Sequence, residues 1–415
     1  MKSNYKIFND PVYGFITIPQ GILLDVIDHP WFQRLRRIKQ TGMTHLVYPG
    51  ALHTRFHHLL GALHLAMQAV DVLQQKGVDI SEEEREGLYL AILLHDIGHG
   101  PFSHALEKHF VDLPHEEISL LYMKYFNALW PGKLDIAIQI FSDQYPKAFL
   151  HQLISGQIDL DRMDYLKRDS FYTGVAEGVI GHDRIIKMLH VIDGQLVVEE
   201  KGIYSIEKFL VARRLMYWQV YLHKTSLSAE LMLQHFWQRL KELVLTGQYS
   251  ISNPTLNYFI HHPTPPDPST DPSSLLQRYA SIDDIDIEYE IKRAVRAQDP
   301  LLQLLATGLN ERLLFSLEYN STKSKTELVK KMNQSEQLNM QNLSDKLVWQ
   351  GFERNIFYQS NVKDEIFILA KSGSVKPFAE LSEFEMHQKI IEKKFICYPK
   401  NKLLLHLLNN SKDFD

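Results

Sequence analysis

The sequence predicts a mainly α-helical protein with a small β insertion and a mixed α+β C-terminal part. Three observations predict this class. Apolar residues recur at helical spacing through most of residues 1–250. The clearest strand-like stretch in that region, Gln195-Leu196-Val197-Val198, is short and resembles one arm of an inserted hairpin. Helical and strand-like patterns mix only after a proline-rich run at residues 263–268.

Periodicity and capping signals set the expected helices. Amphipathic helices are predicted over residues 25–39, 54–76, 82–95, 116–129, 158–169, 205–223 and 226–245. Ser81 and Glu84 form a capping-box pattern at the start of the third helix. The run Gly98-His99-Gly100-Pro101 ends it, because glycine and proline are both unfavourable inside a helix.

The proline-rich run also predicts the domain organisation. Residues 1–250 are expected to form one domain, 251–274 a linker, and 275–415 a C-terminal α+β lobe. In that lobe, helical patterns cover residues 301–317 and 323–347, and a strand-like pattern covers 365–370. No motif in the lobe indicates a chemistry, so the chemistry is expected upstream.

Composition limits the classes of protein. The chain has 415 residues, of which 45% are apolar and 23% charged, as in ordinary globular proteins. Its net charge of −5 argues against a generic cationic binder of nucleic acid or anionic membranes. A single cysteine, Cys397, excludes an internal disulfide framework and a thiolate zinc site. With no signal core and no membrane-length apolar run, a cytoplasmic protein without a membrane partner is expected.

The chain contains 20 histidines, an unusually high number, and many of them lie between His45 and His115. In the helix predicted over 54–76, His58 begins a row beside the apolar stripe, whereas His57 lies on the polar face. A single buried histidine is usually just hydrogen-bonded in the core. His58 alone therefore does not indicate a metal.

His95-Asp96 changes that interpretation. The pair ends the very apolar helical stretch 89–94, which predicts that both side chains are buried. An ionised aspartate buried beside an imidazole is unfavourable unless a cation or an ion pair compensates. With His58 upstream and more histidines downstream, a bound metal ion is the simplest compensation.

The fourth ligand is expected to be an oxygen donor from the acidic segment 158–169. On a helix, Asp161, Tyr165 and Asp169 form one stripe, whereas Asp159 and Asp164 do not lie on it. A charge run is usually a solvated face, but this mixture of acids and a phenol better suits the wall of a polar cleft. Two histidines with two aspartates accept Mn, Fe, Ni, Co or Zn, and also Mg.

These residues carry a family resemblance. His58, His95-Asp96 and Asp161 match the H…HD…D metal signature of the HD-domain phosphohydrolase superfamily. Segments 32–40, 54–58, 95–104 and 159–165 resemble its deoxynucleoside triphosphate triphosphohydrolase (dNTPase) branch, which includes a vertebrate antiviral enzyme and bacterial dGTPases. A match of several ordered segments is more specific than an HD pair. The resemblance implies an HD-domain helical core and one divalent metal ion held by His58, His95, Asp96 and Asp161.

The resemblance also implies a reaction. Water attacks the α-phosphorus of a dNTP and releases a deoxynucleoside and tripolyphosphate. The protein-bound metal would polarise the phosphate and activate water, and further Mg would accompany the nucleotide. Arg55, Arg162 and Arg213 match the positions that bind phosphate in the family, with Arg162 where the vertebrate enzyme usually has lysine.

Histidines are expected to carry the proton transfers, because imidazole titrates near neutrality. By family match, His104 with Glu107 resembles the dyad that handles the attacking or leaving group. His99 and His115 would contact the phosphate. His109 is expected to be a bystander.

The remaining contacts to substrate follow from the same resemblance. The positions that read deoxyribose in the family correspond to Gln40, Tyr165, Asp169 and Tyr221. Thr41 stands where the vertebrate enzyme has leucine. The neighbouring Tyr217-Trp218 is expected to be helical core.

A nucleotide activator and a homo-oligomer, from dimer to hexamer, are also implied by the family. Positions that bind activating nucleotides between subunits correspond to Lys6, Asn9, Asp28, Gln33 and Arg36. The alternative is that these residues only pack a dimer. Ile186 and Glu199-Glu200-Lys201 stand where the vertebrate enzyme has basic phosphate-binding residues. Because acidic residues repel triphosphate, altered effector specificity, or none, is expected.

Three other hypotheses stay open. Another HD activity, a nucleotide phosphodiesterase or phosphatase, would use the same metal ligands. A catalytically silent nucleotide-sensing scaffold is a different class, and the complete ligand set argues against it. A nucleic-acid role is conceivable because dGTPase relatives contact DNA, but the net charge gives it no support.

Overall fold

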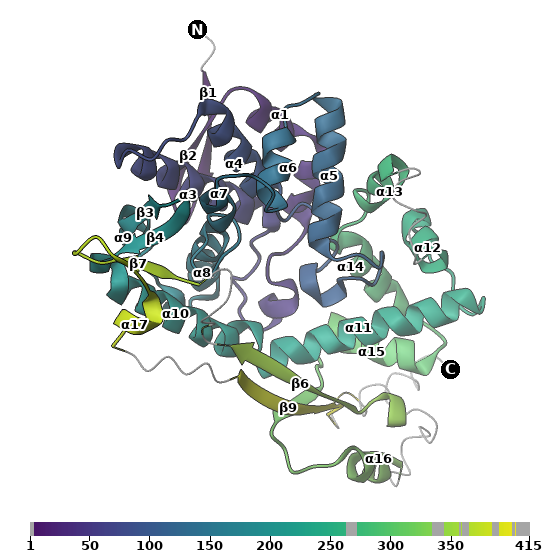
Figure 1. Cartoon of the computed structure of the whole chain (residues 1–415). Helices are drawn as coiled ribbons and strands as arrows, with labels where there is room; N and C mark the ends of the chain where they lie inside the picture. The colour runs from purple at the N-terminus through teal and green to yellow at the C-terminus, as the bar shows by residue number, and fades with distance from the viewer. Residues whose placement is uncertain are drawn as a thin grey trace.

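The computed structural model describes residues 4–262, 272–333, 344–356, 358, 365–383, 390–400 and 403 (Figure 1). Its helices are α1 Ile22–Asp28, α2 Pro30–Gln33, α3 Arg55–Gln75, α4 Glu82–Leu94, α5 His115–Leu129, α6 Asp135–Phe141, α7 Ala148–Gln152, α8 Leu160–Thr173, α9 His182–Met188, α10 Ile203–Met216, α11 Lys224–Leu245, α12 Pro254–His261, α13 Pro272–Tyr279, α14 Asp284–Ala294, α15 Pro300–Asn310, α16 Lys325–Asn333 and α17 Phe378–Leu381. The predicted mainly α-helical class is confirmed.

The strands form small sheets around the helices. They are β1 Tyr5–Asp10, β2 Gly14–Pro19, β3 Leu189–Ile192, β4 Gln195–Glu199, β5 Ser316–Tyr319, β6 Trp349–Ile356, β7 Phe367–Leu369, β8 Val375–Pro377 and β9 Ile390–Tyr398. Within the described residues the strand orders are β1-β2, β3-β4-β7-β8 and β5-β9-β6. The inserted hairpin is the antiparallel pair β3–β4, and β7 joins β4 in parallel. The hairpin β1–β2 at the N-terminus was not predicted.

The two helices that carry the HD motif begin and end as their sequences predict. At the start of α4 the Glu84 amide donates to Ser81 Oγ over 3.2 Å, and the Ser81 amide donates to Glu84 Oε2 over 2.8 Å. The predicted capping box is therefore present. After α3, Gly77 has φ of +84°, a conformation that residues with a Cβ rarely adopt.

The helix predicted over 25–39 is wrong as a single helix. The chain instead forms α1, α2 and the 3₁₀ turn Arg34–Arg37. Pro30 divides the first two, because it has no N–H to donate and it favours an extended conformation in the residue before it. His29 is accordingly extended, with ψ of 135°.

Two other predicted helices are too long. The α-helix predicted over 205–223 ends at Met216 and continues as a π-helical turn, Tyr217–Tyr221. The helix predicted over 301–317 ends at Asn310, and β5 follows it. Of the helix predicted over 323–347, residues 334–343 lie outside the described residues.

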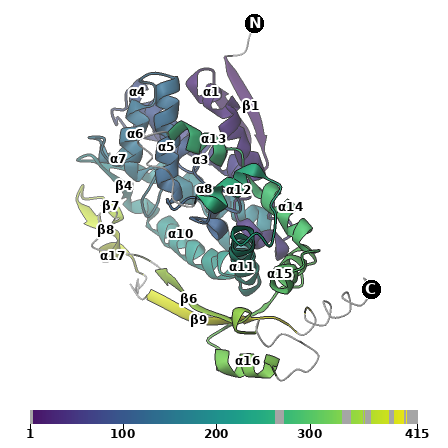
Figure 2. The same cartoon turned by 90° about the vertical axis from the view of Figure 1, so that its right-hand side faces the viewer.

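Helices on both sides of the proline-rich segment share a hydrophobic core. In Figure 2, α13 lies against α5, and the Tyr122 hydroxyl donates to the Leu276 carbonyl over 3.4 Å. The division into residues 1–250 and 275–415 stays a prediction, and residues 263–268 lie outside the described part. The β5-β9-β6 sheet lies at the end of the molecule opposite the N-terminus (Figure 1). Among the described helices, none combines the length and apolarity that a membrane crossing requires.

Candidate active site and metal centre

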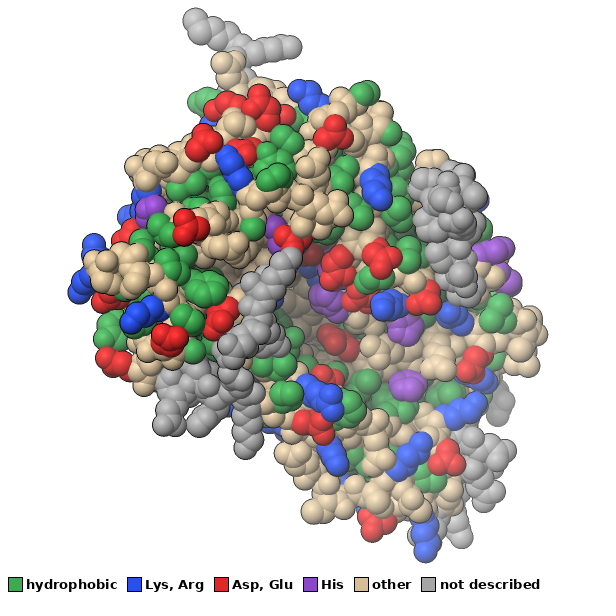
Figure 3. Space-filling view, in the orientation of Figure 1, with side chains coloured by type: hydrophobic (Ala, Val, Ile, Leu, Met, Phe, Trp, Pro, Cys, Tyr) green, Lys and Arg blue, Asp and Glu red, His purple; other side chains and the backbone are tan. Residues whose placement is uncertain are grey.

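A cavity of about 490 Å³ opens between the helices of the HD motif and α11. Figure 3 shows the hollow on one face of the molecule, where histidine and acidic side chains gather. Its lining residues are Gln40, Thr41, Gly42, Thr44, Arg55, Asp96, Phe102, Ser103, His104, Ala105, His115, Asp161, Tyr165, Asp169, Tyr217, Tyr221, Leu222 and Glu230.

The four predicted metal ligands lie together at one end of this cavity. His58 comes from α3, His95 and Asp96 directly follow α4, and Asp161 is in the first turn of α8. Asp161 Oδ1 lies 3.1 Å from His58 Nε2 and 3.5 Å from His95 Nε2. Asp96 approaches the same two nitrogens to 3.7 and 3.5 Å. Three helices thus bring four donor side chains to one point.

Both imidazoles are oriented as metal ligands require. His58 Nδ1 lies 2.8 Å from Asp164 Oδ2, and His95 Nδ1 lies 2.7 Å from the Ile92 carbonyl. Each ring therefore donates from Nδ1, and the lone pair of Nε2 faces the other donors. Both Nε2 atoms are buried and lack a hydrogen-bond partner among the described residues. A buried nitrogen normally has a partner, so the donor set fits a divalent metal ion.

Asp164 is the part of this centre that the sequence did not reveal. It leaves the stripe of Asp161, and its carboxylate faces α3 instead of the cavity. The Arg168 guanidinium donates to Asp164 over 2.9 and 3.0 Å and to Asp10 of β1 over 2.7 Å. Gly61 leaves the space for this pair, since a Cβ there would lie 2.0 Å from Asp164 Oδ1. Asp164 fixes His58, and Arg168 fixes Asp164.

Arg55 and Asp96 join the metal centre to the rest of the cavity. The Arg55 guanidinium donates to Asp96 and, over 3.0 Å, to Ser103 Oγ. Burial disfavours the charged form of Asp96, but His95 and Arg55 outweigh burial and hold its pKa well below the usual range. Asp96 is therefore anionic at neutral pH, as a carboxylate donor to a metal ion must be.

Metal affinity and the stability of the metal-free protein are expected to depend on pH in opposite directions. Burial lowers the pKa of His58, but Asp161 and Asp164 outweigh it and raise the pKa to about 10. Because an unfolded histidine titrates near 6.5, the proton stabilises the metal-free fold fully below pH 6.5, and this contribution is lost as pH rises toward 10. A metal ion competes for the same nitrogen, so its affinity rises over that interval.

Denaturant titrations of EDTA-treated protein, with and without added Mn²⁺, check both trends. A metal-free stability that does not change between about pH 6.5 and 10 would contradict the assignment of the His58 proton.

The predicted proton-transfer residues form a second cluster beside the metal centre. Glu107 binds two imidazoles: its Oε2 lies 3.0 Å from His104 Nδ1 and its Oε1 lies 2.7 Å from His115 Nδ1. The His99 and His115 ring centroids are 3.8 Å apart, and His115 Nε2 lies 3.8 Å from Asp96 Oδ1. Hydrogen bonds to His104 and His115 hold the pKa of Glu107 well below its usual range, although burial opposes them. The sequence indicated the Glu107–His104 pair and named His115 as a phosphate contact, but it did not indicate the bond between His115 and Glu107.

The chain reaches this arrangement through an unusual turn after α4. A Cβ on Gly98 would lie 2.1 Å from the His115 carbonyl oxygen, so only glycine allows α5 to approach this closely. Phe102 and Ser103 have φ of 57° and 53°, in the left-handed region that is unfavourable for both residues. Contacts from other elements must hold this turn in place.

Of the predicted substrate-binding residues, Gln40, Arg55, Tyr165, Asp169 and Tyr221 line the cavity. The Tyr221 hydroxyl donates to Asp169 Oδ2 over 2.6 Å, and His53 Nε2 lies 2.7 Å from Asp169 Oδ1. Asp169 thereby fixes the Tyr221 hydroxyl on the cavity wall.

Arg162 and Arg213 do not line the cavity. The Arg162 guanidinium donates to Asp159 Oδ2 over 2.6 Å, and Arg213 donates to the Ile356 carbonyl over 3.4 Å. Both lie near Tyr165: burial raises the pKa of that phenol, and the two guanidinium charges oppose the rise. Their contact with phosphate stays a prediction.

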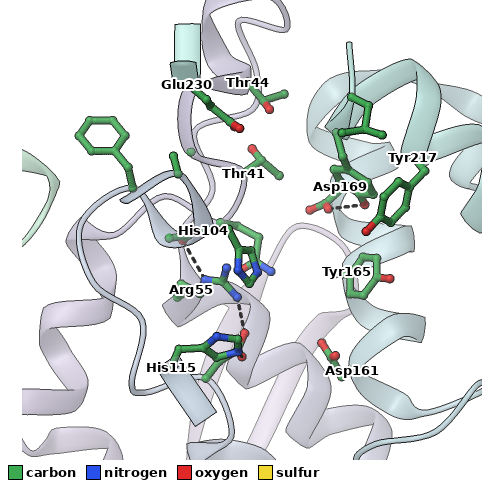
Figure 4. Close-up of a pocket in the computed structure, with 18 residues that line it drawn as sticks. Thr41, Thr44, Arg55, His104, His115, Asp161, Tyr165, Asp169, Tyr217 and Glu230 are labelled. Carbon is green, nitrogen blue, oxygen red and sulfur yellow. Dashed lines mark hydrogen bonds and ion pairs between the residues drawn. The ribbon is translucent and has the colours of Figure 1, made fainter. Parts of the chain in front are cut away.

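The cavity wall also contains residues that were not predicted as site residues, among them Thr44, Tyr217 and Glu230 (Figure 4). The expectation that Tyr217 belongs to the helical core is wrong. The π-helical turn that starts at Tyr217 changes the angle between successive side chains, so helical periodicity does not predict which of them face the cavity. Glu230 comes from α11, where no local pattern distinguishes it from a surface glutamate.

The residues predicted to bind an activator lie on the surface near β1. Lys6 Nζ is 2.8 Å from Asp28 Oδ1, and the Arg36 guanidinium donates to Gln33 Oε1 over 2.7 Å. Asn9 is paired within the β1–β2 hairpin. An activator role for these residues stays a prediction.

The fold and the site define a helical hydrolase with an HD-type metal centre, and comparisons with known proteins agree. The HD domain family matches residues 55–169, and the HD associated region matches residues 180–251. The structure of a phosphohydrolase from Bacteroides thetaiotaomicron is 46% identical, has a TM-score of 0.89, and aligns over 95% of this chain and 100% of that one. This chain belongs to the HD-domain phosphohydrolases.

Curated relatives agree with this assignment. The Bacillus subtilis protein YwfO is 34% identical over 326 residues, 77% of this chain and 73% of YwfO. The deoxynucleoside triphosphate triphosphohydrolase SAMHD1 homolog of Dictyostelium discoideum is 35% identical over 253 residues. That alignment covers 56% of this chain and 49% of the Dictyostelium protein. The predicted family, including its relation to dNTPases, is confirmed.

Proposed function

We propose that this protein hydrolyses dNTPs to a deoxynucleoside and tripolyphosphate, with water attacking the α-phosphorus. The observation that carries the proposal is that one cavity contains three kinds of group. The cavity is lined by Asp96 and Asp161 of the metal set, by His104 and His115 of the histidine cluster, and by Tyr165, Asp169 and Tyr221. Hydrolysis of a dNTP requires three functions that correspond to these three sets of residues: phosphate binding, proton transfer and sugar recognition.

His58, His95, Asp96 and Asp161 would hold one divalent ion, which supplies Lewis acidity toward the phosphate and a more acidic water. Further Mg would arrive with the nucleotide. Arg55, the guanidinium in the cavity wall, would neutralise phosphate charge beside the metal set. Its bond to Ser103 holds the guanidinium in one orientation, so binding requires little rearrangement.

Proton transfer is assigned to the His104–Glu107 pair. Because Glu107 accepts from Nδ1, the Nε2 of His104 is the nitrogen left to exchange a proton with water or with the leaving 5′-oxygen. The His104 side chain is 63% exposed, so a proton can return from solvent. His115, held by the same carboxylate, would contact the phosphate.

Tyr165 and Asp169, on the wall opposite His104, would bind the deoxyribose, and the base would point toward Thr41, Thr44 and Glu230 (Figure 4). Tyr221, which donates to Asp169, would assist them. Burial, assisted by Glu353, raises the pKa of Glu230 to about 8. Near neutral pH its carboxyl group can therefore both donate and accept a hydrogen bond. Such a group distinguishes bases by their donor and acceptor pattern.

Glu230→Ala is expected to narrow the spread of kcat/KM among the four dNTPs by about tenfold, the value of one buried hydrogen bond. The measurement is kcat/KM for each dNTP separately. Glu242→Ala, a surface position on the same helix that pairs with Arg239, is the control. An equal loss for all four dNTPs would show that Glu230 does not read the base.

Product analysis tests the proposed function. Purified protein loaded with Mn²⁺ or Mg²⁺ is incubated with each dNTP and NTP, alone and in pairs. Free deoxynucleoside with intact tripolyphosphate is expected. Release of orthophosphate or a nucleoside monophosphate would favour the alternative, another HD-type phosphatase or phosphodiesterase. Turnover only with nucleotide pairs would reveal an activator site. We also propose that the protein forms a homo-oligomer, which light scattering would test.

A further inference from the structure

The first residue of α14, Asp284, contacts two turns that belong to the active-site cavity. Its Oδ1 accepts the Phe102 amide over 2.7 Å, and its Oδ2 accepts the Lys39 amide over 2.9 Å. Lys39 Nζ lies 3.4 Å from the same Oδ2. The residue is only 1% exposed, so the carboxylate is surrounded by protein. These contacts join positions more than 180 residues apart in the sequence.

Each of the two turns carries groups of the proposed site. Gln40 follows Lys39, and Ser103 and His104 follow Phe102. Ser103 Oγ donates to the Lys39 carbonyl over 2.8 Å and accepts from the Arg55 guanidinium over 3.0 Å. The two turns and Arg55 therefore form one hydrogen-bonded unit, with the Asp284 carboxylate on its outer side.

The turn at Phe102 requires such an outer support. Phe102 and Ser103 both have left-handed φ values, which persist only where surrounding contacts over-determine them. Tyr279, at the end of α13, also packs on this turn: a Cβ on Gly100 would lie 2.5 Å from its hydroxyl oxygen. Tyr279 and Asp284, both after the proline-rich run, thus contact this turn, and neither lines the cavity.

We propose that Asp284 is a positioning residue, whose carboxylate ties the turn of Gln40 to the turn of Ser103 and His104 and so fixes the substrate cavity from the C-terminal part of the chain. The inference rests on the proposed function of that cavity. It assigns a role to α14, for which the sequence indicated none. The geometry requires a carboxylate, because two N–H donors approach two separate oxygens.

The pKa of Asp284 distinguishes a positioning role from simple stabilisation of the fold. Burial raises the pKa of Asp284 to about 6, although Lys39 and the two amides oppose it, and Glu288 adds to the rise. The neighbouring His45 is another titratable group near Lys39 and Glu288: burial and the Lys39 charge lower its pKa, although the Gly42 carbonyl and Glu288 oppose them. Because the folded state binds this proton more tightly than the unfolded state does, stability falls as pH rises through the interval from about 3.8 to 6. At neutral pH the charge therefore destabilises the fold.

Asp284→Asn tests the proposal, because asparagine removes the charge but turns one acceptor into a donor that faces an N–H. We expect kcat/KM for dNTPs, measured well below the melting temperature of each variant, to fall between about 10-fold and 100-fold, as for a misplaced catalytic group. The change in melting temperature is expected to be small, because removal of the buried charge offsets the new donor that faces an N–H. Asp286→Asn is the control. Asp286 caps α14 by accepting the Asp283 amide over 2.8 Å, and it contacts neither turn.

Hydrogen exchange gives a second readout that does not depend on turnover. The Lys39 and Phe102 amides are expected to exchange faster in Asp284→Asn than in the wild type, and at wild-type rates in Asp286→Asn. Unchanged exchange, or activity that falls only in step with the melting temperature, would overturn the positioning role. If the wild-type protein leaves every dNTP intact but the amides of Asp284→Asn still exchange faster, the proposed reaction would be overturned. The structural tie through Asp284 would be kept.

Discussion

His95→Ala is expected to release the metal ion and to lower hydrolysis by about a thousandfold or more, because a Lewis-acid metal contributes several kcal/mol to stabilising the transition state. The substitution removes one of two imidazole donors whose Nε2 atoms face the centre. It leaves Asp96 bound to Arg55 and His58 bound to Asp164, so the surrounding packing is retained. Elemental analysis of the purified variant and an activity assay in excess Mn²⁺ measure the two losses. Asp96→Ala should have the same result.

His109→Ala is the matched control, because His109 lies in the same histidine-rich region but outside both clusters. It should keep one metal ion per chain and wild-type turnover. A His95→Ala protein that folds, loses its metal and still hydrolyses nucleotides would exclude the metal-dependent mechanism.

Glu107→Gln is expected to lower turnover between about 10²-fold and 10⁴-fold while the metal content stays unchanged. The carboxylate accepts from two imidazoles at once, and an amide can accept with only one of its two atoms. At least one ring then loses its orientation, and the site loses a negative charge beside it. Turnover under saturating dNTP, together with metal analysis, separates this effect from loss of the metal.

Glu116→Gln controls for a charge change near the same ring. Its side chain is 60% exposed, and Oε2 lies 3.4 Å from His115 Nδ1. Exposed pairs of this kind contribute little, so near-normal turnover is expected. Equal losses in the two variants would mean that Glu107 acts only through bulk charge and not by orienting the imidazoles.

Local signals in the sequence were sufficient where helix boundaries depend on nearest neighbours. Ser81 and Glu84 predicted the start of α4, and Gly77 the end of α3, because capping involves groups within one turn. The prediction of one helix over 25–39 is wrong because Pro30, itself a local signal, divides that stretch into α1 and α2. The helix predicted over 301–317 is wrong at its end for a different reason. Residues of β5 form a strand only because β9, distant in the sequence, supplies their hydrogen bonds.

The sequence by itself pointed to a metal site at His58, His95 and Asp96 beside a histidine cluster, because an aspartate and several histidines at the end of an apolar helix need a chemical reason to be there, and the family resemblance added Asp161 as the fourth donor. It did not determine which groups hold these donors in position. Asp164 behind His58, the second bond of Glu107 to His115, and Asp284 behind Phe102 each join residues from different elements. Periodicity along one helix carries no information about such contacts. Only the packing of α3, α5, α8 and α14 around one cavity decided them.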